Sequence, residues 1–343
     1  MAKLTIIDIA KMAGVSPSTV SLVINKRPNV SAQTREKVLE VINKTNFVPS
    51  QSARNQIMKK TQNIALIYGI NIHPLDHMFH ESLNKCILDY CMKNHYNLVF
   101  VACEYDNDSF VVPPVLLSHG ADGIISFGYM PESVIGDILK LDIPYVQIDS
   151  HQSFPASANV SVDYYKAACL AMDYLIGHGH RKIAYIGSNF PLRYSKQTFD
   201  GYRASMGEID FQVPMKWIQM QSRDIDGDDS AESQMLSILE NDERPTAVFC
   251  GADIYAIGAI RAIKKKGLRV PDDISVIGID DLPIDSYIDP PLTSVHVDTK
   301  ELSDIGCDML FKKIAHSEAI QDNIVYSDFS ISERASVSTI KTL

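Results

Sequence analysis

The side chains with the clearest chemical potential in this sequence are small polar residues near the N-terminus. They crowd the segment TIIDIAKMAGVSPSTVSLVIN, residues 5–25. Ser16 followed by Pro17 is typical of a helix start, because serine can cap the first turn and proline needs no backbone N–H there. Hydroxyl groups, free N–H groups at a helix start and nearby basic side chains are the groups that hold phosphates. The segment therefore predicts contact with a nucleic acid backbone.

Short helices are the elements that would position these side chains. Thr5 is a candidate N-cap for a helix over residues 6–13, and Gly14 ends its apolar pattern. A second helix is expected from Pro17 to about Asn25. One helix, a tight turn and a second capped helix form a helix-turn-helix, which can place its second helix in the major groove of DNA.

Helical spacing continues beyond this motif. Ser31 is the N-cap of a third expected helix, in which Val38, Leu39 and Ile42 recur at helical spacing. A break at Pro49 precedes one more short helix, expected near residues 50–58. A small helical bundle with solvated basic faces is the alternative interpretation of residues 1–60.

The geometry of a helix-turn-helix sorts the candidate DNA contacts into two groups. The N-terminal end of the second helix would meet base edges through Pro17, Ser18, Ser21 and Leu22. Contacts with the backbone are expected from capping and neighbouring side chains, namely Thr5, Ser16, Thr19, Asn25, Ser31, Thr34 and Arg35.

The distribution of charge favours the nucleic-acid interpretation. The chain has 32 Lys and Arg against 42 Asp and Glu, a formal net charge of −10. Residues 1–60 hold ten basic and three acidic side chains, whereas the rest of the chain holds 22 basic and 39 acidic ones. The first part is thus +7 and the second −17. This asymmetry predicts a polyanionic partner for the N-terminal segment alone.

Length and composition bound the class of protein. The 343 residues suggest two or three domains, and 45% apolar with 22% charged residues is typical of a globular protein rather than a disordered or fibrous one. No apolar run approaches the roughly 18 residues of a membrane span. The N-terminus has no cleavable apolar region, so we expect a cytoplasmic protein. The six cysteines lack CxxC spacing and are interpreted as reduced core thiols.

The apolar period changes at Asn63. Short β-rich runs follow at residues 64–68, 97–101, 123–127, 145–148, 183–187, 247–250 and 275–279. Helical patterns separate them, for example at 80–94, 164–177, 229–241 and 253–266. This alternation predicts an α/β core of parallel sheets with helices on both faces, and its length predicts two lobes.

Catalytic and metal motifs are weak in this sequence. It contains no GxGxxG after a strand, no GxxxxGK[ST], no GxSxG and no HExxH. The acid pairs Asp272-Asp273 and Asp280-Asp281 are sequence neighbours, which point apart in a strand and are better read as loop caps. His73, His77 and His80 could meet on a helix as metal ligands, but Pro74 interrupts the run. We therefore predict neither an enzyme, nor a metal site, nor a cofactor.

A family resemblance extends over nearly the whole chain. TIIDIAKMAGVSPSTVSLVIN, NVSAQTREKV (29–38) and NFVPSQSAR (46–54) closely resemble the DNA-binding signature of the lactose/galactose-repressor (LacI/GalR) family of bacterial transcription regulators. GADGIISFG (120–128) and PTAVFCGADIYAIGAIRAIKKKGLRVPDDISVIGIDD (245–281) look like the family's effector-binding core. The resemblance implies a homodimer on a near-palindromic operator. It also implies two doubly wound lobes, similar to periplasmic sugar-binding proteins, with three crossings and the effector between them.

The same resemblance implies the domain boundaries. A helix-turn-helix headpiece would occupy residues 1–60 and include a hinge helix at 50–58. The effector-binding and dimerisation core would occupy 61–343. Its N-lobe is expected at about 62–162 plus 293–324, and its C-lobe at about 163–292 plus 325–337.

Two departures from the family pattern concern DNA. Leu22 stands where many members carry Arg or His, so it offers a base only apolar contact. The hinge run is Ala53, Arg54, Asn55, Gln56 and Ile57, with Gln56 in place of the Leu that enters a minor-groove step in the family. We expect an altered half-site and a shallower or shifted kink.

The effector site is likewise drawn from the resemblance. Its expected residues are Phe79, His80, Asp149, Lys196, Thr198, Asp229, Ala252 and Asp280. Asp280 matches the family acid that accepts hydrogen bonds from a ligand. Lys196, Thr198 and Ala252 replace polar groups common in the family, and Asp229 stands near a common aromatic position. Surface packing for Phe79 and His80, and a capping role for Asp280, are the alternatives.

The sequence thus predicts a sequence-specific repressor controlled by a small-molecule effector, a carbohydrate or sugar phosphate. A corepressor-dependent regulator that responds to a purine or another non-sugar metabolite is the alternative. A small-molecule binding protein without a DNA role and a metabolic enzyme of the doubly wound class are two further classes.

Overall fold

A computed structural model describes residues 4–24, 27–45, 47, 60–68, 78–101, 103–106, 109–128, 130–150, 157–188, 193–221, 228–315 and 324–340. The chain divides into two units, Met1–Thr61 and Gln62–Leu343, each with its own core. Residues Asn25, Ala53, Arg54, Gln56 and Ile57, and the expected hinge helix, lie outside the described ranges.

Three helices form the first unit: α1 (Ile6–Ala13), α2 (Pro17–Ile24) and α3 (Ala32–Thr45). They enclose an apolar core of Ile9, Ala10, Ala13, Val20, Val23, Val38 and Phe47. Leu39, expected at helical spacing with Val38, is 44% exposed and is not part of this core. The inward face of α3 continues instead through Val41 and Ile42, three and four residues after Val38.

Local chemistry defines where these helices begin and end. Thr5 and Asp8 form a reciprocal capping box at the start of α1, and Gly14 ends it in the left-handed conformation with φ of 63°. The bounds predicted for the first two helices are confirmed to within one residue, whereas the predicted break at Pro49 lies outside the described residues. In the described part of the chain no single helix is long and apolar enough to cross a membrane. Only α1 and α2 together reach that length and composition, bent by 102° at their break.

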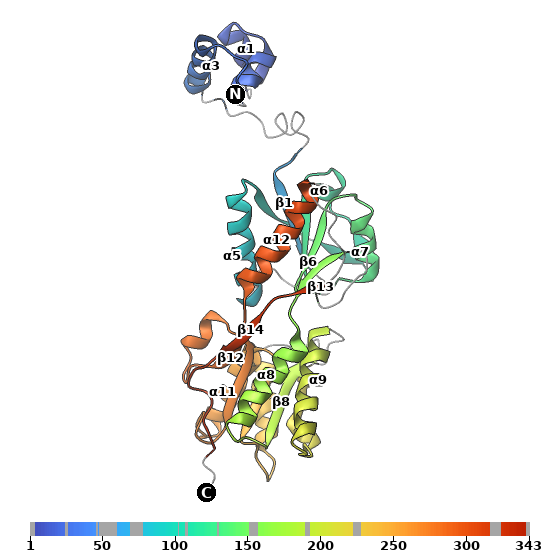
Figure 1. The fold of residues 1–343 in the computed structure, drawn as a ribbon, viewed down its shortest axis with the longest axis vertical. Coiled ribbons are helices and arrows are strands. Elements are labelled where there is room, and N and C mark those ends of the chain that lie inside the picture. The colour runs from blue at the N-terminus through green and yellow to red at the C-terminus, as the bar shows by residue number, and fades with distance from the viewer. Residues whose placement is uncertain are drawn as a thin grey trace. The chain divides into compact units, whose positions relative to one another are not determined.

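The second unit contains two six-stranded sheets and a small β3–β4 hairpin (Figure 1). The first sheet has the order β13-β7-β6-β5-β1-β2, with every neighbouring pair parallel. Its strands are β1 (Asn63–Tyr68), β2 (Asn97–Val101), β5 (Gly123–Phe127), β6 (Tyr145–Ile148), β7 (Ala158–Ser161) and β13 (Ile324–Tyr326). The hairpin is β3 (Glu104–Asp106) and β4 (Ser109–Val111).

The second sheet has the order β14-β12-β11-β10-β8-β9, and only the β12–β14 pair is antiparallel. Its strands are β8 (Ile183–Ser188), β9 (Ile218–Gln221), β10 (Ala247–Cys250), β11 (Ser275–Asp280), β12 (Thr293–Val297) and β14 (Phe329–Ser332). All seven strands expected from the apolar runs are present, so the predicted two-lobed α/β architecture is confirmed.

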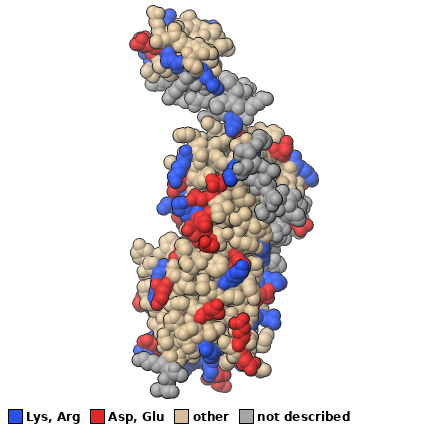
Figure 2. Space-filling model, viewed as in Figure 1, with Lys and Arg blue, Asp and Glu red and all other residues tan. Residues whose placement is uncertain are grey.

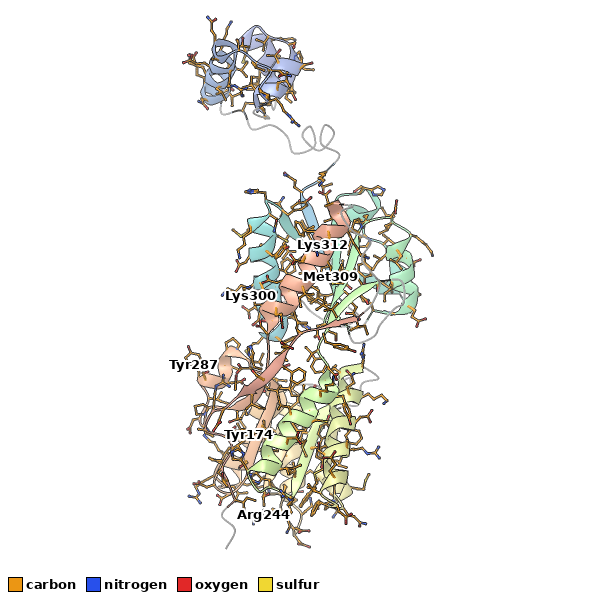
Figure 3. All side chains as sticks on the ribbon, in the orientation of Figure 1. Tyr174, Arg244, Tyr287, Lys300, Met309 and Lys312 are labelled. Atoms are coloured by element: carbon orange, nitrogen blue, oxygen red, sulfur yellow. The ribbon has the colours of Figure 1, made fainter. Side chains whose placement is uncertain are left out.

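Helices cover both faces of each sheet. In the first lobe α5 (Met78–Lys93) and α12 (Thr299–Ala315) pack together on one face, with Lys300, Met309 and Lys312 along α12 (Figure 3). The other face carries α6 (Pro114–Leu117) and α7 (Glu132–Leu139). The second lobe has α8 (Tyr164–Gly177) and α9 (Arg193–Glu208) on one face and α10 (Asp228–Leu239) and α11 (Asp253–Lys265) on the other. Short helices η1 (Met215–Trp217) and η2 (Pro283–Ser286) complete the lobe.

The chain crosses between the lobes three times, after β7, after β12 and after β13. Two of the expected boundaries need correction. Residues 293–297 pair with β11 and so lie in the second lobe, not in the N-lobe as expected. Residues 325 and 326 pair with β7 and lie in the first lobe. Strand pairing decides lobe membership, and the sequence of a short apolar strand does not state its partner.

All six cysteines are free thiols, three of them buried. Burial raises the pKa of Cys91, Cys250 and Cys307 above the usual range, which keeps these thiols protonated and unreactive.

Candidate functional site

The capping residues of the first unit hold its helices and also carry its candidate DNA contacts. The Ser16 hydroxyl accepts the Thr19 N–H at 3.1 Å, and the Ser31 hydroxyl accepts the Thr34 N–H at 3.2 Å. The Thr5 hydroxyl donates to Asp8 at 2.7 Å. Each of these hydroxyls lies at the start of a helix, where backbone N–H groups and the helix dipole favour an anion.

The base-reading candidates lie on α2. Pro17 and Ser18 are exposed, and Ser21 and Leu22 are partly exposed on the same helix. Val20 and Val23 alternate with them and are buried in the core of this unit. Arg35 donates from its guanidinium to the Arg27 carbonyl, which fixes it beside the α2–α3 connection. Basic side chains are visible on the displayed face of this unit (Figure 2).

In the second unit the carboxyl ends of strands from both sheets bring together two of the three acids predicted for the effector site. Asp149 follows β6 of the first lobe, and Asp280 ends β11 of the second. Tyr164, the first residue of α8, donates its hydroxyl hydrogen to Asp149 Oδ1 at 2.9 Å. Burial, and then the charges of Asp149 and Asp280, raise the pKa of Tyr164 well above its usual range. Tyr164 therefore remains a donor between the two acids.

Asp280 lies in an electrostatically unfavourable position for a carboxylate. Burial, and then the negative charges of Asp253 and Asp149, raise its pKa well above the usual range. Its φ is 128°, and that of Asp281 is 58°, so the turn after β11 is strained. Strain of this kind is typical of binding sites, because the surrounding structure must hold the residue in place.

Phe79 and His80 do not pack at the surface, which was the alternative interpretation of these two residues. Both are buried, in a group of rings at the carboxyl ends of β1 and β5. His80 stacks on Phe127 with ring centroids 6.1 Å apart and meets Tyr68 edge-on at 6.0 Å. His73 and His77 lie outside the described residues.

Thr198 and Ala252 lie at the carboxyl ends of the second sheet. Thr198 is buried, and its hydroxyl is 3.1 Å from that of Tyr185. Ala252 caps α11 without a side-chain hydrogen bond, directly before buried Asp253.

Lys196 and Asp229 are not brought to this group. Lys196 is 80% exposed and pairs with Asp200 one turn along α9. Asp229 is 86% exposed and pairs with Arg261 at 2.7 Å. It lies beside a separate pocket of about 460 Å³ between β9 and α10. Their polar side chains are therefore occupied by surface ion pairs in the described structure.

Sequence reasoning missed Tyr164, Tyr194 and Asp253. The Tyr194 ring meets that of Tyr164 edge-on at 5.9 Å, which adds an aromatic surface beside the acids. One signal was available, since Tyr164 and Asp253 each begin a helix directly after a strand, where doubly wound folds gather their ligands.

Two family models match the chain. Residues 5–50 match the bacterial regulatory proteins of the lacI family, and residues 172–337 match a periplasmic binding protein-like domain. The HTH-type transcriptional repressor PurR of Mannheimia succiniciproducens is 32% identical over 93% of this chain and 95% of its own. Catabolite control protein A of Priestia megaterium is 32% identical over 97% and 98%. The ribose operon repressor of Haemophilus influenzae is 31% identical over 90% and 92%.

Solved structures agree on the fold. The lac repressor dimer bound to operator and the anti-inducer ONPF has a TM-score of 0.82 at 22% identity, covering 98% of this chain and all of that one. A LacI family regulator from Enterococcus faecium with bound ribose has a TM-score of 0.69 at 21% identity over 81% of this chain and all of that one. With the family models and the relatives above 30% identity, these matches show that the chain belongs to the lacI family of bacterial regulatory proteins.

Proposed function

We propose that this chain is a repressor whose affinity for operator DNA is set by an uncharged carbohydrate held between its lobes. Membership of the lacI family makes it a DNA-binding transcriptional regulator, and its relatives are regulators rather than enzymes. The observation that carries the effector part is the approach of Asp149 and Asp280 from opposite lobes to one tyrosine. We propose that the protein acts in the cytoplasm, because its DNA partner is there.

The charge of this group selects among effector classes. Carboxylates accept hydrogen bonds from hydroxyl groups in fixed directions, and Tyr164 and Tyr194 offer ring surfaces to a sugar face. A phosphate group would be repelled by the negative charges of Asp149 and Asp253, which also raise the pKa of Asp280. This repulsion favours a neutral sugar over a sugar phosphate. Two solved structures that resemble this chain in fold hold cellobiose and ribose, which agrees with that preference.

The DNA part of the proposal uses residues 1–60 of each protomer in a homodimer. Two copies of α2 would enter successive major grooves of a near-palindromic operator. Pro17, Ser18, Ser21 and Leu22 would face base edges. The backbone contacts would come from Thr5, Ser16, Thr19, Asn25, Ser31, Thr34 and Arg35, with Ala53, Arg54, Gln56 and Ile57 at the minor groove between half-sites.

Effector binding and DNA binding would be coupled through the three chain segments that cross between the lobes. Residues 61–343 carry the effector site and the dimer contacts in this proposal. An effector that touches both Asp149 and Asp280 binds one relative position of the lobes better than another. Only such unequal affinity can shift the population of DNA-competent dimers.

A thermal-shift screen of neutral sugars, sugar phosphates and purines tests the effector class. We expect a rise of several degrees with a neutral sugar at saturating concentration, because ligand at 100 times Kd stabilises by about 2.7 kcal/mol. The response should be lost in Asp280→Asn and retained in the matched variant Asp229→Asn, whose carboxylate is exposed on α10. A rise with phosphates or purines alone, or equal responses from the two variants, would contradict the proposal.

A further inference from the structure

We infer that Asp285 holds a proton at neutral pH and donates it in a hydrogen bond to Asp253, which positions the turn that carries Asp280. Asp285 belongs to η2, and Asp253 is the first residue of α11. Both side chains are buried with no exposed area. The inference concerns a pair of carboxyl groups behind the proposed effector site rather than a ligand contact.

The two sides of η2 have opposite environments. Tyr287, which follows the helix directly, is 85% exposed and projects outward (Figure 3). Asp285 points inward, where its carboxyl group meets that of Asp253. In the described part of the chain, no N–H or hydroxyl group donates to either carboxyl oxygen of Asp285. Two ionised carboxylates can only accept, so this buried contact is favourable only when one of them carries a proton.

The remaining hydrogen bonds assign that proton to Asp285. Asp253 accepts the Ser294 hydroxyl hydrogen at 2.7 Å and the Leu282 N–H at 3.2 Å. Burial raises the pKa of Asp253, and these donors oppose that rise because they stabilise its ionised form. Burial, followed by the charge of Asp253, raises the pKa of Asp285 to about 10.

The charges around the pair leave this assignment in place. Asp280 on β11 would raise the pKa of Asp285 further when it is ionised, and Cys250 at the end of β10 is a neutral thiol. The nearby basic groups bond to Asp281 rather than to Asp285. Asp281 accepts a hydrogen bond from Arg334 and another from His296 Nδ1, the latter at 2.8 Å. Arg334 also donates to the Leu292 carbonyl at 2.7 Å, so its charge is shared with groups other than Asp285.

The pair matters because Asp253 holds the strained turn after β11. Its carboxylate accepts from the Leu282 N–H and from the Ser294 hydroxyl, and the Ser294 oxygen in turn accepts the Asp281 N–H at 3.2 Å. Loss of the Asp285 proton would place two anions side by side in the interior and push Asp253 out of this arrangement. Asp285 is thus a positioning residue for Asp280. The positioning of Asp280 rests on the proposed effector site, whereas the protonation of Asp285 does not.

The pH dependence of stability tests the proton directly. An Asp with a raised folded pKa binds an extra proton in the native state, so its contribution is largest at low pH and is lost as pH rises towards 10. One such proton lowers the folding equilibrium constant by up to about tenfold per pH unit. Chemical denaturation of the full chain between pH 6 and 9 measures this effect. The free energy of unfolding should fall more steeply with pH for the wild type than for Asp285→Asn, whose amide donates without titrating.

Asp242→Asn is the matched control, because it makes the same change at an exposed carboxyl group after α10. Its free energy of unfolding should fall with pH as steeply as that of the wild type. Infrared difference spectra of the wild type at pH 7 should show a protonated-carboxyl band that Asp285→Asn lacks, a readout that needs no effector or DNA. Equal slopes for the wild type and Asp285→Asn would overturn the inference. So would the absence of that band from the wild type, which also decides the matter if Asp285→Asn does not fold.

Discussion

Tyr164 and Asp149 join the two lobes through one buried hydrogen bond of 2.9 Å, from the first residue of α8 to the residue after β6. The donor belongs to the second lobe and the acceptor to the first. Asp149 adopts a left-handed φ of 49°, so the chain turns at this residue directly after β6. The length of this bond therefore depends on the relative position of the two lobes.

Removal of the hydroxyl in Tyr164→Phe should destabilise the protein by about 1–3 kcal/mol, because Asp149 would keep its burial and lose a donor. Urea denaturation measures the change. Tyr165→Phe is the control, since Tyr165 is 40% exposed and its loss should fall within about 0.5 kcal/mol. Equal losses of unfolding free energy for the two variants would show that the Tyr164–Asp149 bond does not stabilise the protein.

Gly278→Ala should be strongly unfavourable. A Cβ at Gly278 of β11 would lie 2.0 Å from Asp253 Oδ1, a buried atom already held by Ser294. We expect a loss of about 1–3 kcal/mol in denaturation experiments, the usual cost of overpacking, with weaker effector binding as the Asp280 turn moves.

Gly136→Ala provides the contrast, because a Cβ there meets nothing within 4 Å on helix α7. It should be neutral or stabilise by up to about 1 kcal/mol. A Gly278→Ala variant as stable as Gly136→Ala would refute the tight packing of the β11 turn on Asp253.

Leu22→Arg should change which operator is bound rather than merely how tightly. Leu22 is partly exposed on α2 and offers a base only apolar contact, whereas Arg donates two hydrogen bonds to guanine. Fluorescence anisotropy with single-base operator variants should reveal a new preference of about 1–3 kcal/mol for guanine at one position per half-site. Identical profiles for wild type and variant would place Leu22 away from the bases.

Gln56→Leu, in the segment outside the described residues, should tighten operator binding and increase the bend. An apolar side chain can enter a base step where glutamine cannot. A circular-permutation gel shift compares the bend angles, with Gln51→Leu as a control that adds the same side chain elsewhere in the segment. Unchanged bending in Gln56→Leu would show that the kink does not depend on position 56.

The sequence was sufficient for the local elements and the two-lobed core. Thr5, Gly14 and Ser16 define helix ends through bonds within a few residues, so the pattern predicts them well. The pairing of β12 and β13 depends on residues far along the chain. The crossings after these strands were therefore misplaced, although the strands are short apolar segments like the others.

The site was only partly predictable for a similar reason. Asp149 and Asp280 end apolar strands, and their approach follows from the fold. Lys196 and Asp229 occupy aligned positions, yet their side chains form surface ion pairs. Asp285 had no sequence signal, because its partner Asp253 lies 32 residues earlier and only burial makes the pair unusual.

Selection of operator DNA by the full chain shows whether this protein binds DNA in a sequence-specific way. Sites recovered from a random pool should be near-palindromic and bind at least about 1,000 times more tightly than scrambled DNA at 150 mM salt. Affinity should fall steeply as salt rises, because phosphate contacts release counterions. The Ser18→Asp variant should lose the preference without loss of stability. Equal affinity for selected and scrambled DNA would contradict the account.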